Sequence, residues 1–150
     1  MTQQRRLHEK PLVYRRAVAR GRLRLRAATV RAIRSGTIEK GDPLSAAELA
    51  GVLAIKRTPE LLPHCHPIRL TGSRVDVRLG ARGVIVEAEA EAIDRTGVEM
   101  ETLVGASIAL LTVWDMVKYL EKDPDGTYPS TALESIRVVR KEKRPAEGSP

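Results

Sequence analysis

From Arg20 to Arg26, arginine occupies every second position, and small or apolar residues stand between. Strict alternation predicts a half-buried strand whose polar face is basic. Residues 28–34 then predict a short helix, which Ser35-Gly36 ends.

Residues 45–55 have the pattern of an amphipathic helix, and Asp42 with Pro43 supplies a suitable start. We expect its apolar face to pack against the rest of the protein. That face contains Ala46, Leu49, Ala50, Leu53 and Ala54.

Two further alternating segments, 74–79 and 87–92, predict a pair of strands joined by a hairpin loop over residues 80–83. Arginine and aspartate alternate with apolar residues in the first segment, and glutamate alternates with alanine in the second. If the glutamate strand lies beside the arginine strand, their charged faces pair across the sheet. This structural explanation would account for many of the charges without any function.

Residues 99–121 predict one long helix that is apolar on nearly all sides. A domain of this size cannot easily bury such a helix alone, so we expect a homo-oligomer. The apolar positions are Leu103, Val104, Ile108, Leu110, Leu111, Val113, Trp114 and Val117.

Residues 136–139 predict a last strand, so the order is strand, helix, helix, strand, strand, helix, strand. This order indicates an α+β fold with helices packed on one face of an antiparallel sheet. We expect a flexible tail over residues 1–10, a single domain over 11–141 and a charged tail over 142–150.

The net charge of +7 favours anionic partners, which include phosphorylated metabolites and nucleic acid. Aromatic residues make up only 3% of the chain, which disfavours nucleic-acid binding through base stacking. No secretory signal follows Arg5 and Arg6, the longest apolar run is too short and polar to cross a membrane, and there is a single cysteine. A cytoplasmic protein is expected.

Asp115 and Lys118 are three residues apart on the long helix and therefore share a face. An ordinary surface ion pair explains this spacing. The apolar residues around the pair favour another interpretation, in which a partly desolvated Lys118 has a lowered pKa and exchanges protons near neutral pH.

His64-Cys65-His66 raises the possibility of a metal site. A closed zinc site needs about four ligands, and the sequence offers no second cluster with ligand spacing. We therefore expect no metal here.

Several basic residues are candidate phosphate ligands, although each could equally be a solvated surface charge. They are Lys40, Lys56, Arg57 and Arg15, with Arg16 as the rival of Arg15. Glu99 and Glu101 open the long helix, where acidic residues complement the helix dipole without any further role.

Five strings together resemble the cyclic pyranopterin monophosphate synthase family of molybdenum-cofactor biosynthesis. The resemblance is strong from Lys40 to Lys118 and weaker outside that range. The strings are Lys40-Gly41-Asp42, Lys56-Arg57-Thr58, Cys65-His66-Pro67, residues 96–101, and Asp115-Met116-Val117-Lys118. The resemblance implies a ferredoxin-like fold, a hexamer built from dimers, and an active site at a subunit interface.

The resemblance also implies a lyase that needs no cofactor. Its substrate would be the cyclised dihydro derivative of GTP (3',8-cyclo-7,8-dihydro-GTP), converted to cyclic pyranopterin monophosphate with release of pyrophosphate. The residues carried over are Lys118, Asp115 and Lys40 for catalysis, and Arg15, Lys56, Cys65, His66, Met100 and Glu101 for substrate binding, with Cys65 as a small buried residue.

One departure from the family lies near the C-terminus. Its usual Gly-Gly-Lys-Ser-Gly string is replaced here by residues 140–145, so the role of Lys141 stays open. A basic nucleic-acid-binding protein and an inactive relative that serves as an assembly partner are the alternatives.

The two ends of the long helix cannot serve the same small group in one chain. Glu101 and Asp115 are fourteen residues apart, which is about 21 Å along a straight helix. Either one of them contacts a distant end of the ligand, or a neighbouring chain completes the site.

Overall fold

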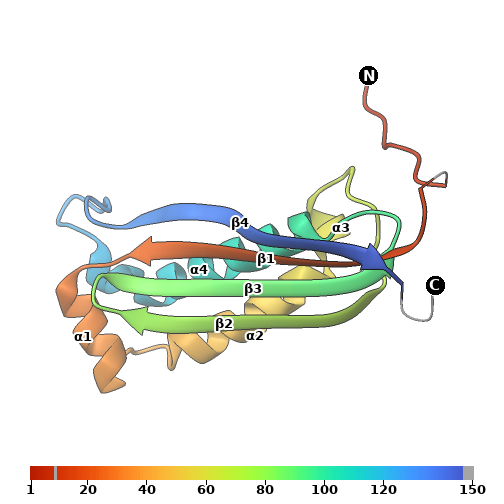
Figure 1. Cartoon of the computed structure of the whole chain (residues 1–150). Helices are drawn as coiled ribbons and strands as arrows, with labels where there is room; N and C mark the ends of the chain where they lie inside the picture. The colour runs from red at the N-terminus through yellow and green to blue at the C-terminus, as the bar shows by residue number, and fades with distance from the viewer. Residues whose placement is uncertain (9, 147–150) are drawn as a thin grey trace.

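The computed structural model describes residues 1–8 and 10–146 of the chain. A four-stranded antiparallel sheet has the strand order β2-β3-β1-β4, and the long helices cover one of its faces (Figure 1). The elements are β1 (Val13–Arg24), α1 (Ala27–Ser35), α2 (Pro43–Lys56), α3 (Thr58–Leu61), β2 (Leu70–Gly80), β3 (Gly83–Asp94), α4 (Glu99–Glu121) and β4 (Ala132–Pro145). The predicted α+β, ferredoxin-like architecture is confirmed.

The core lies between the sheet and the helices. Alternate residues of each central strand face it, as the period of two requires, and β3 contributes Val84, Val86, Ala88, Ala90 and Ala92, all buried. The predicted hairpin is confirmed, because β2 and β3 pair up to Gly80 opposite Gly83.

Helices α2 and α4 cross at two glycines. A Cβ atom on Gly105 would lie 2.6 Å from Ile55, and one on Gly51 would lie 3.1 Å from the backbone oxygen of Gly105. The predicted buried face of α2 is therefore partly wrong. The face against α4 is the one that carries Gly51, because small residues allow the closest approach, and Leu49 and Leu53 remain exposed.

All four strands are longer than predicted, and two of their C-terminal ends change the picture. β1 ends at Arg24, because Arg26 is already the N-cap of α1. β4 continues to Pro145, and Arg16 pairs with Glu142 across the β1–β4 ladder. Residues 142–145, which were expected in a charged tail, therefore belong to the sheet, and only Ala146 of the expected tail lies beyond it among the described residues.

Helix α4 has the predicted bounds. By length and composition it could also cross a membrane, although only a third of its most apolar window is buried inside this single chain. Its buried residues Ala106, Ala109, Leu110, Val113 and Val117 belong to the protein core. This packing identifies α4 as a core helix of the domain and leaves other apolar side chains, such as Leu111, uncovered.

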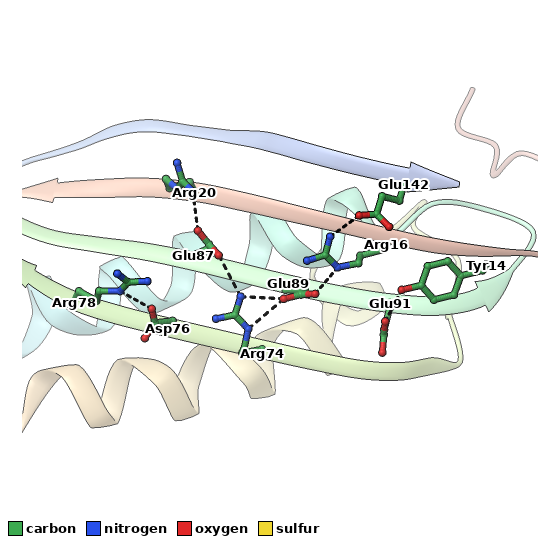
Figure 2. Close-up of polar contacts among 10 residues, drawn as sticks. All are labelled: Tyr14, Arg16, Arg20, Arg74, Asp76, Arg78, Glu87, Glu89, Glu91 and Glu142. Carbon is green, nitrogen blue, oxygen red and sulfur yellow. Dashed lines mark hydrogen bonds and ion pairs between the residues drawn. The ribbon is translucent and has the colours of Figure 1, made fainter. Parts of the chain in front are cut away.

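The predicted pairing of charged strand faces is confirmed for part of the sheet. On the face opposite the helices, Arg20 contacts Glu87 at 2.8 Å and Arg74 contacts Glu89 at 2.9 Å (Figure 2). Arg16 bridges Glu89 and Glu142 in the same network. These arginines hold the pKa values of Glu87 and Glu89 below their usual range, in spite of partial burial.

A buried carboxylate that the sequence analysis missed fixes the C-terminal end of α4. Glu121 is 1% exposed and accepts hydrogen bonds from the backbone N–H of Arg26 and from the hydroxyls of Thr29 and Thr131. Since every one of these donors lies on another segment, Glu121 ties α4 to the start of α1 and to the residue that precedes β4.

Candidate functional site

Four of the predicted site residues surround one cavity at the N-terminal end of α4. The cavity has a volume of about 770 Å³, and its walls come from residues 62–68, from residues 96–101 and from Val138 of β4. Pro63 and Pro67 keep the first of these segments out of helix, as expected. The predicted residues in its lining are Cys65, His66, Met100 and Glu101.

Glu101 is the most unusual group in this cavity. Its side chain is 2% exposed, its Oε2 accepts a hydrogen bond from Cys65 Sγ at 3.6 Å, and its Oε1 has no partner among the described residues. Burial raises the pKa of Glu101 above its usual range. A buried carboxyl oxygen without a donor is costly, so the cavity offers an acceptor that a ligand N–H or O–H could satisfy.

Cys65 supports this carboxyl and is not a nucleophile. Burial, together with the neighbouring Glu101, raises the pKa of the Cys65 thiol to about 11. Since the thiolate is the reactive form, the thiol is inert near neutral pH.

Lys141 lies beside the same cavity, although sequence analysis left its role open. It stands in β4 opposite Ala17, and its Nζ reaches Glu99 Oε1 at 2.6 Å. Burial acts to raise the pKa of Glu99, but the Lys141 ion pair, a backbone hydrogen bond and the charge of Arg15 together outweigh it, so the pKa of Glu99 falls. A regular strand thus places the lysine without the glycine-rich loop of the family.

The two rival arginines of β1 point to opposite faces of the sheet. Arg16 is engaged in the network of Figure 2. Arg15 is buried, and its guanidinium donates to the backbone oxygens of Asp94 (3.1 Å) and Arg95 (3.3 Å). Arg15 therefore holds the loop that leads into α4 and supports the cavity from beneath, without lining it.

The predicted catalytic residues form a second group, near the other end of α4. Asp115 contacts Lys118 at 3.0 Å and Lys40, in the turn before α2, at 3.8 Å. All three side chains are about half exposed. The predicted lowering of the Lys118 pKa is wrong for this chain alone, because the hydrogen bond and the charge of Asp115 raise it.

Tyr119 is a contributor to this group that sequence analysis missed. Its hydroxyl accepts a hydrogen bond from the backbone N–H of Glu39 at 3.0 Å. The residue before it on α4 is Lys118, and the residue after Glu39 is Lys40. The contact therefore ties the turn that carries one lysine to the helix that carries the other.

Replacing Asp115 by asparagine should lower the pKa of Lys118 towards that of a free lysine, because the charge that raises it is gone. NMR titration of the lysine side chains measures this change. Asp123→Asn is the control, since Asp123 bonds only within its own turn. A Lys118 pKa that is the same in Asp115→Asn and in the parent would contradict the assignment.

The structure brings the predicted residues together in two groups and does not join the groups. Cys65, His66, Met100 and Glu101 lie at one end of α4, and Lys40, Asp115 and Lys118 lie about four turns further along it. Lys56 is the exposed last residue of α2 and precedes α3, which leads into the His66 segment. We call these two groups the carboxyl half-site and the lysine half-site.

Within the described part of the chain, no group of three or more histidine, cysteine, aspartate or glutamate side chains could hold a metal ion. The side chains of the two half-sites can accept a hydrogen bond in a cavity open to solvent, neutralise anionic groups and transfer protons. The chain is therefore a ferredoxin-like domain with two separate groups of polar side chains along α4.

Comparison with known proteins agrees with this assignment. The model of the MoaC family matches residues 5–144, so the chain belongs to the MoaC family. Two relatives, each named probable cyclic pyranopterin monophosphate synthase, come from Pyrococcus abyssi (strain GE5 / Orsay) and Pyrococcus furiosus (strain ATCC 43587 / DSM 3638 / JCM 8422 / Vc1). The first is 52% identical over 134 residues, covering 89% of this chain and 84% of the relative, and the second is 53% identical over 136 residues, covering 91% and 86%.

A relative of the same name from Methanococcoides burtonii (strain DSM 6242 / NBRC 107633 / OCM 468 / ACE-M) is 50% identical over 137 residues, covering 91% of this chain and 86% of the relative. The similarity to these relatives covers nearly the whole chain. The family recognised from five short strings is thereby confirmed.

Proposed function

We propose that this protein is a cyclic pyranopterin monophosphate synthase, a lyase of molybdenum-cofactor biosynthesis. Its substrate is the cyclised dihydro-GTP intermediate, and its products are cyclic pyranopterin monophosphate and pyrophosphate. The observation that carries the proposal is the pairing of two half-sites within a member of this family. One offers an unsatisfied buried carboxyl in a cavity, and the other offers a Lys–Asp–Lys cluster.

The carboxyl half-site suits the ring system of the substrate. Its volume lies in the range of about 300–1,000 Å³ that small-molecule sites occupy. Glu101 can accept a hydrogen bond from a ring N–H, while His66 and Met100 form part of the wall. Lys56 and Arg15 add positive charge on this side of the molecule, and Lys141 neutralises Glu99, which together favour an anionic substrate.

The lysine half-site suits the chemical step. Lys118 is protonated at neutral pH beside Asp115, so it can act as a general acid and can stabilise charge on the departing pyrophosphate. Closing the cyclic phosphate forms a bond from a substrate hydroxyl oxygen to the α-phosphorus and breaks the bond between the α- and β-phosphates. Lys40 is the second cation at this point, and the carboxylate of Asp115 accepts the proton that the hydroxyl loses.

A complete site then needs two subunits. The half-sites lie about 21 Å apart along α4 in one chain, so we assign them to a homo-oligomer in which neighbouring chains contribute one each. Exposed Leu49, Leu53, Leu61 and Leu111 provide apolar surface for such contacts. A hexamer of three dimers in the cytoplasm, with residues 11–141 as one catalytic domain, completes the proposal.

Incubation of the purified protein with the cyclised GTP intermediate tests this function. We expect release of pyrophosphate, and a fluorescent pterin after oxidation of the product. GTP itself is the matched control, because it has the same triphosphate and lacks the extra ring, and it should give neither product. Absence of both products from the cyclised intermediate would refute the proposal.

A further inference from the structure

On the face of the sheet away from the helices, the row of carboxylates ends before the row of arginines does. β3 presents Glu91, Glu89 and Glu87 on this face, but the next position towards the hairpin is Ile85. β1 continues with Arg22 opposite Ile85 and with Arg24 opposite Gly83. The compensation seen in Figure 2 therefore stops at Arg20.

The two arginines at this end of β1, Arg22 and Arg24, line a cavity of about 430 Å³ beside the β2–β3 hairpin. Arg22, Arg24 and Arg82 contribute positive charge, and Glu134 of β4 is the acidic residue in the lining. Three guanidinium groups and one carboxylate leave a net charge of +2. Within the described residues, the side chains of Arg22 and Arg82 have no hydrogen-bond or ion-pair partner. Arg24 donates to the backbone oxygen of Ser130 at 3.3 Å and reaches Glu134 at 4.0 Å.

The backbone around this cavity is fixed. The carbonyl of Arg82 accepts a hydrogen bond from the N–H of Leu25 at 3.0 Å. Gly83 has φ +139, and a Cβ atom there would lie 1.9 Å from the carbonyl oxygen of Leu23, so only glycine allows the hairpin this approach to β1. The turn therefore presents Arg82 next to Arg22 and Arg24 on a rigid support.

We propose that this cavity is a second anion site, specific for the di- or triphosphate group of a small molecule. Its volume exceeds that of a single phosphate and lies within the range of small-molecule sites. Guanidinium forks match phosphate oxygens in pairs. Since Leu23 faces the core, Arg22 and Arg24 point away from the helices, and the site lies on the opposite side of the sheet from Lys40, Asp115 and Lys118.

The test is isothermal titration calorimetry with tripolyphosphate at about 100 mM salt, where surface attraction is partly screened. In the double variant Arg22→Ala with Arg82→Ala, the affinity of this site for tripolyphosphate should fall at least about tenfold, so that one class of site disappears from the titration. The matched control is Arg137→Ala with Arg140→Ala, which removes the same charge from two exposed residues of β4 and should change binding less than about twofold. Parallel titrations with pyrophosphate and ATP show whether a free oligophosphate or a nucleotide is preferred.

Equal stoichiometry and affinity in the double variant and the control would overturn the proposal. The proposal would also be overturned if a single-stranded oligonucleotide bound more tightly than tripolyphosphate and the double variant lost that binding. Such a result would indicate an extended nucleic-acid-binding surface. Glu134→Gln supplies a second test if the double variant does not fold, since removal of the carboxylate should tighten tripolyphosphate binding. Turnover of the cyclised GTP intermediate should be unchanged in the double variant, so this proposal fails or holds independently of the proposed function.

Discussion

Replacing Lys118 by alanine should lower turnover of the cyclised GTP intermediate by about 1,000-fold, the usual size of a general acid–base contribution. The side chain is half exposed, and among the described residues its one ion-pair partner is Asp115, so its removal leaves the core intact. Thermal stability and oligomer size should therefore match those of the parent. Pyrophosphate release under saturating substrate measures the effect.

Lys122→Ala is the control for this variant. Lys122 follows Lys118 by four residues and is exposed at the C-cap of α4, outside both half-sites. The Lys122→Ala variant should turn over the cyclised GTP intermediate at the rate of the parent. If Lys118→Ala also remains within a few-fold of the parent, Lys118 has no part in the mechanism.

Replacing Glu101 by glutamine should abolish most activity and yet stabilise the fold at neutral to alkaline pH. Glutamine keeps the shape, but it is uncharged and carries an NH₂ donor in place of one acceptor oxygen, so a substrate N–H meets either a weaker acceptor or a second donor. We expect a loss of about 100-fold in kcat/KM. The stabilisation follows because burial of the carboxylate opposes its ionisation.

The pH dependence gives this prediction its sign. Burial raises the folded-state pKa of Glu101 above its unfolded value. The contribution of protonated Glu101 to the free energy of unfolding is therefore fully present below the unfolded-state pKa, near 4.3. This contribution is lost as the pH rises through the folded-state pKa. Urea unfolding of Glu101→Gln and the parent should thus differ more at pH 8 than at pH 4. A parent that is more stable than the variant at pH 8 would contradict the burial argument.

The parts of the fold with a strong period could be predicted from the sequence. The alternation in 74–79 and 87–92 located the hairpin, and α4 has its predicted bounds. Binary pattern failed for α2, where Leu49 and Leu53 were expected inside and are exposed. Gly51 and Gly105 decide that contact, because backbone proximity selects small residues over large apolar ones, and a single sequence does not show which glycines meet.

The predicted last strand was too short because the composition of its C-terminal part is misleading. Residues 140–145 are almost all charged, and charge suggests a solvated tail. In the sheet, β4 is an edge strand whose backbone pairs with β1 over the whole of this range. The ladder needs only backbone groups, which leaves charged side chains free to point outwards.

For the site, the residue types were accessible from the sequence and their environments were not. The strings identified Glu101, His66, Asp115 and Lys118, and the helix rise indicated that they form two groups. Apolar neighbours suggested a desolvated Lys118, but on a helix the neighbours in sequence point elsewhere, and the lysine lies half exposed beside Asp115. Oε1 of Glu101 lacks a hydrogen-bond partner because of the way distant segments pack around it, and a local sequence pattern does not encode that packing.

The most direct test of the divided site is subunit mixing. His66→Ala and Lys118→Ala chains, each inactive alone, are mixed in equal amounts, and subunit exchange is verified by mass spectrometry. If each site takes the carboxyl half-site from one chain and the lysine half-site from its neighbour, random pairing leaves about a quarter of the sites with both halves intact. We predict that pyrophosphate release from the cyclised GTP intermediate recovers to about that fraction of the parent rate. Activity that stays at zero after confirmed exchange would place the whole site within one chain and contradict the account.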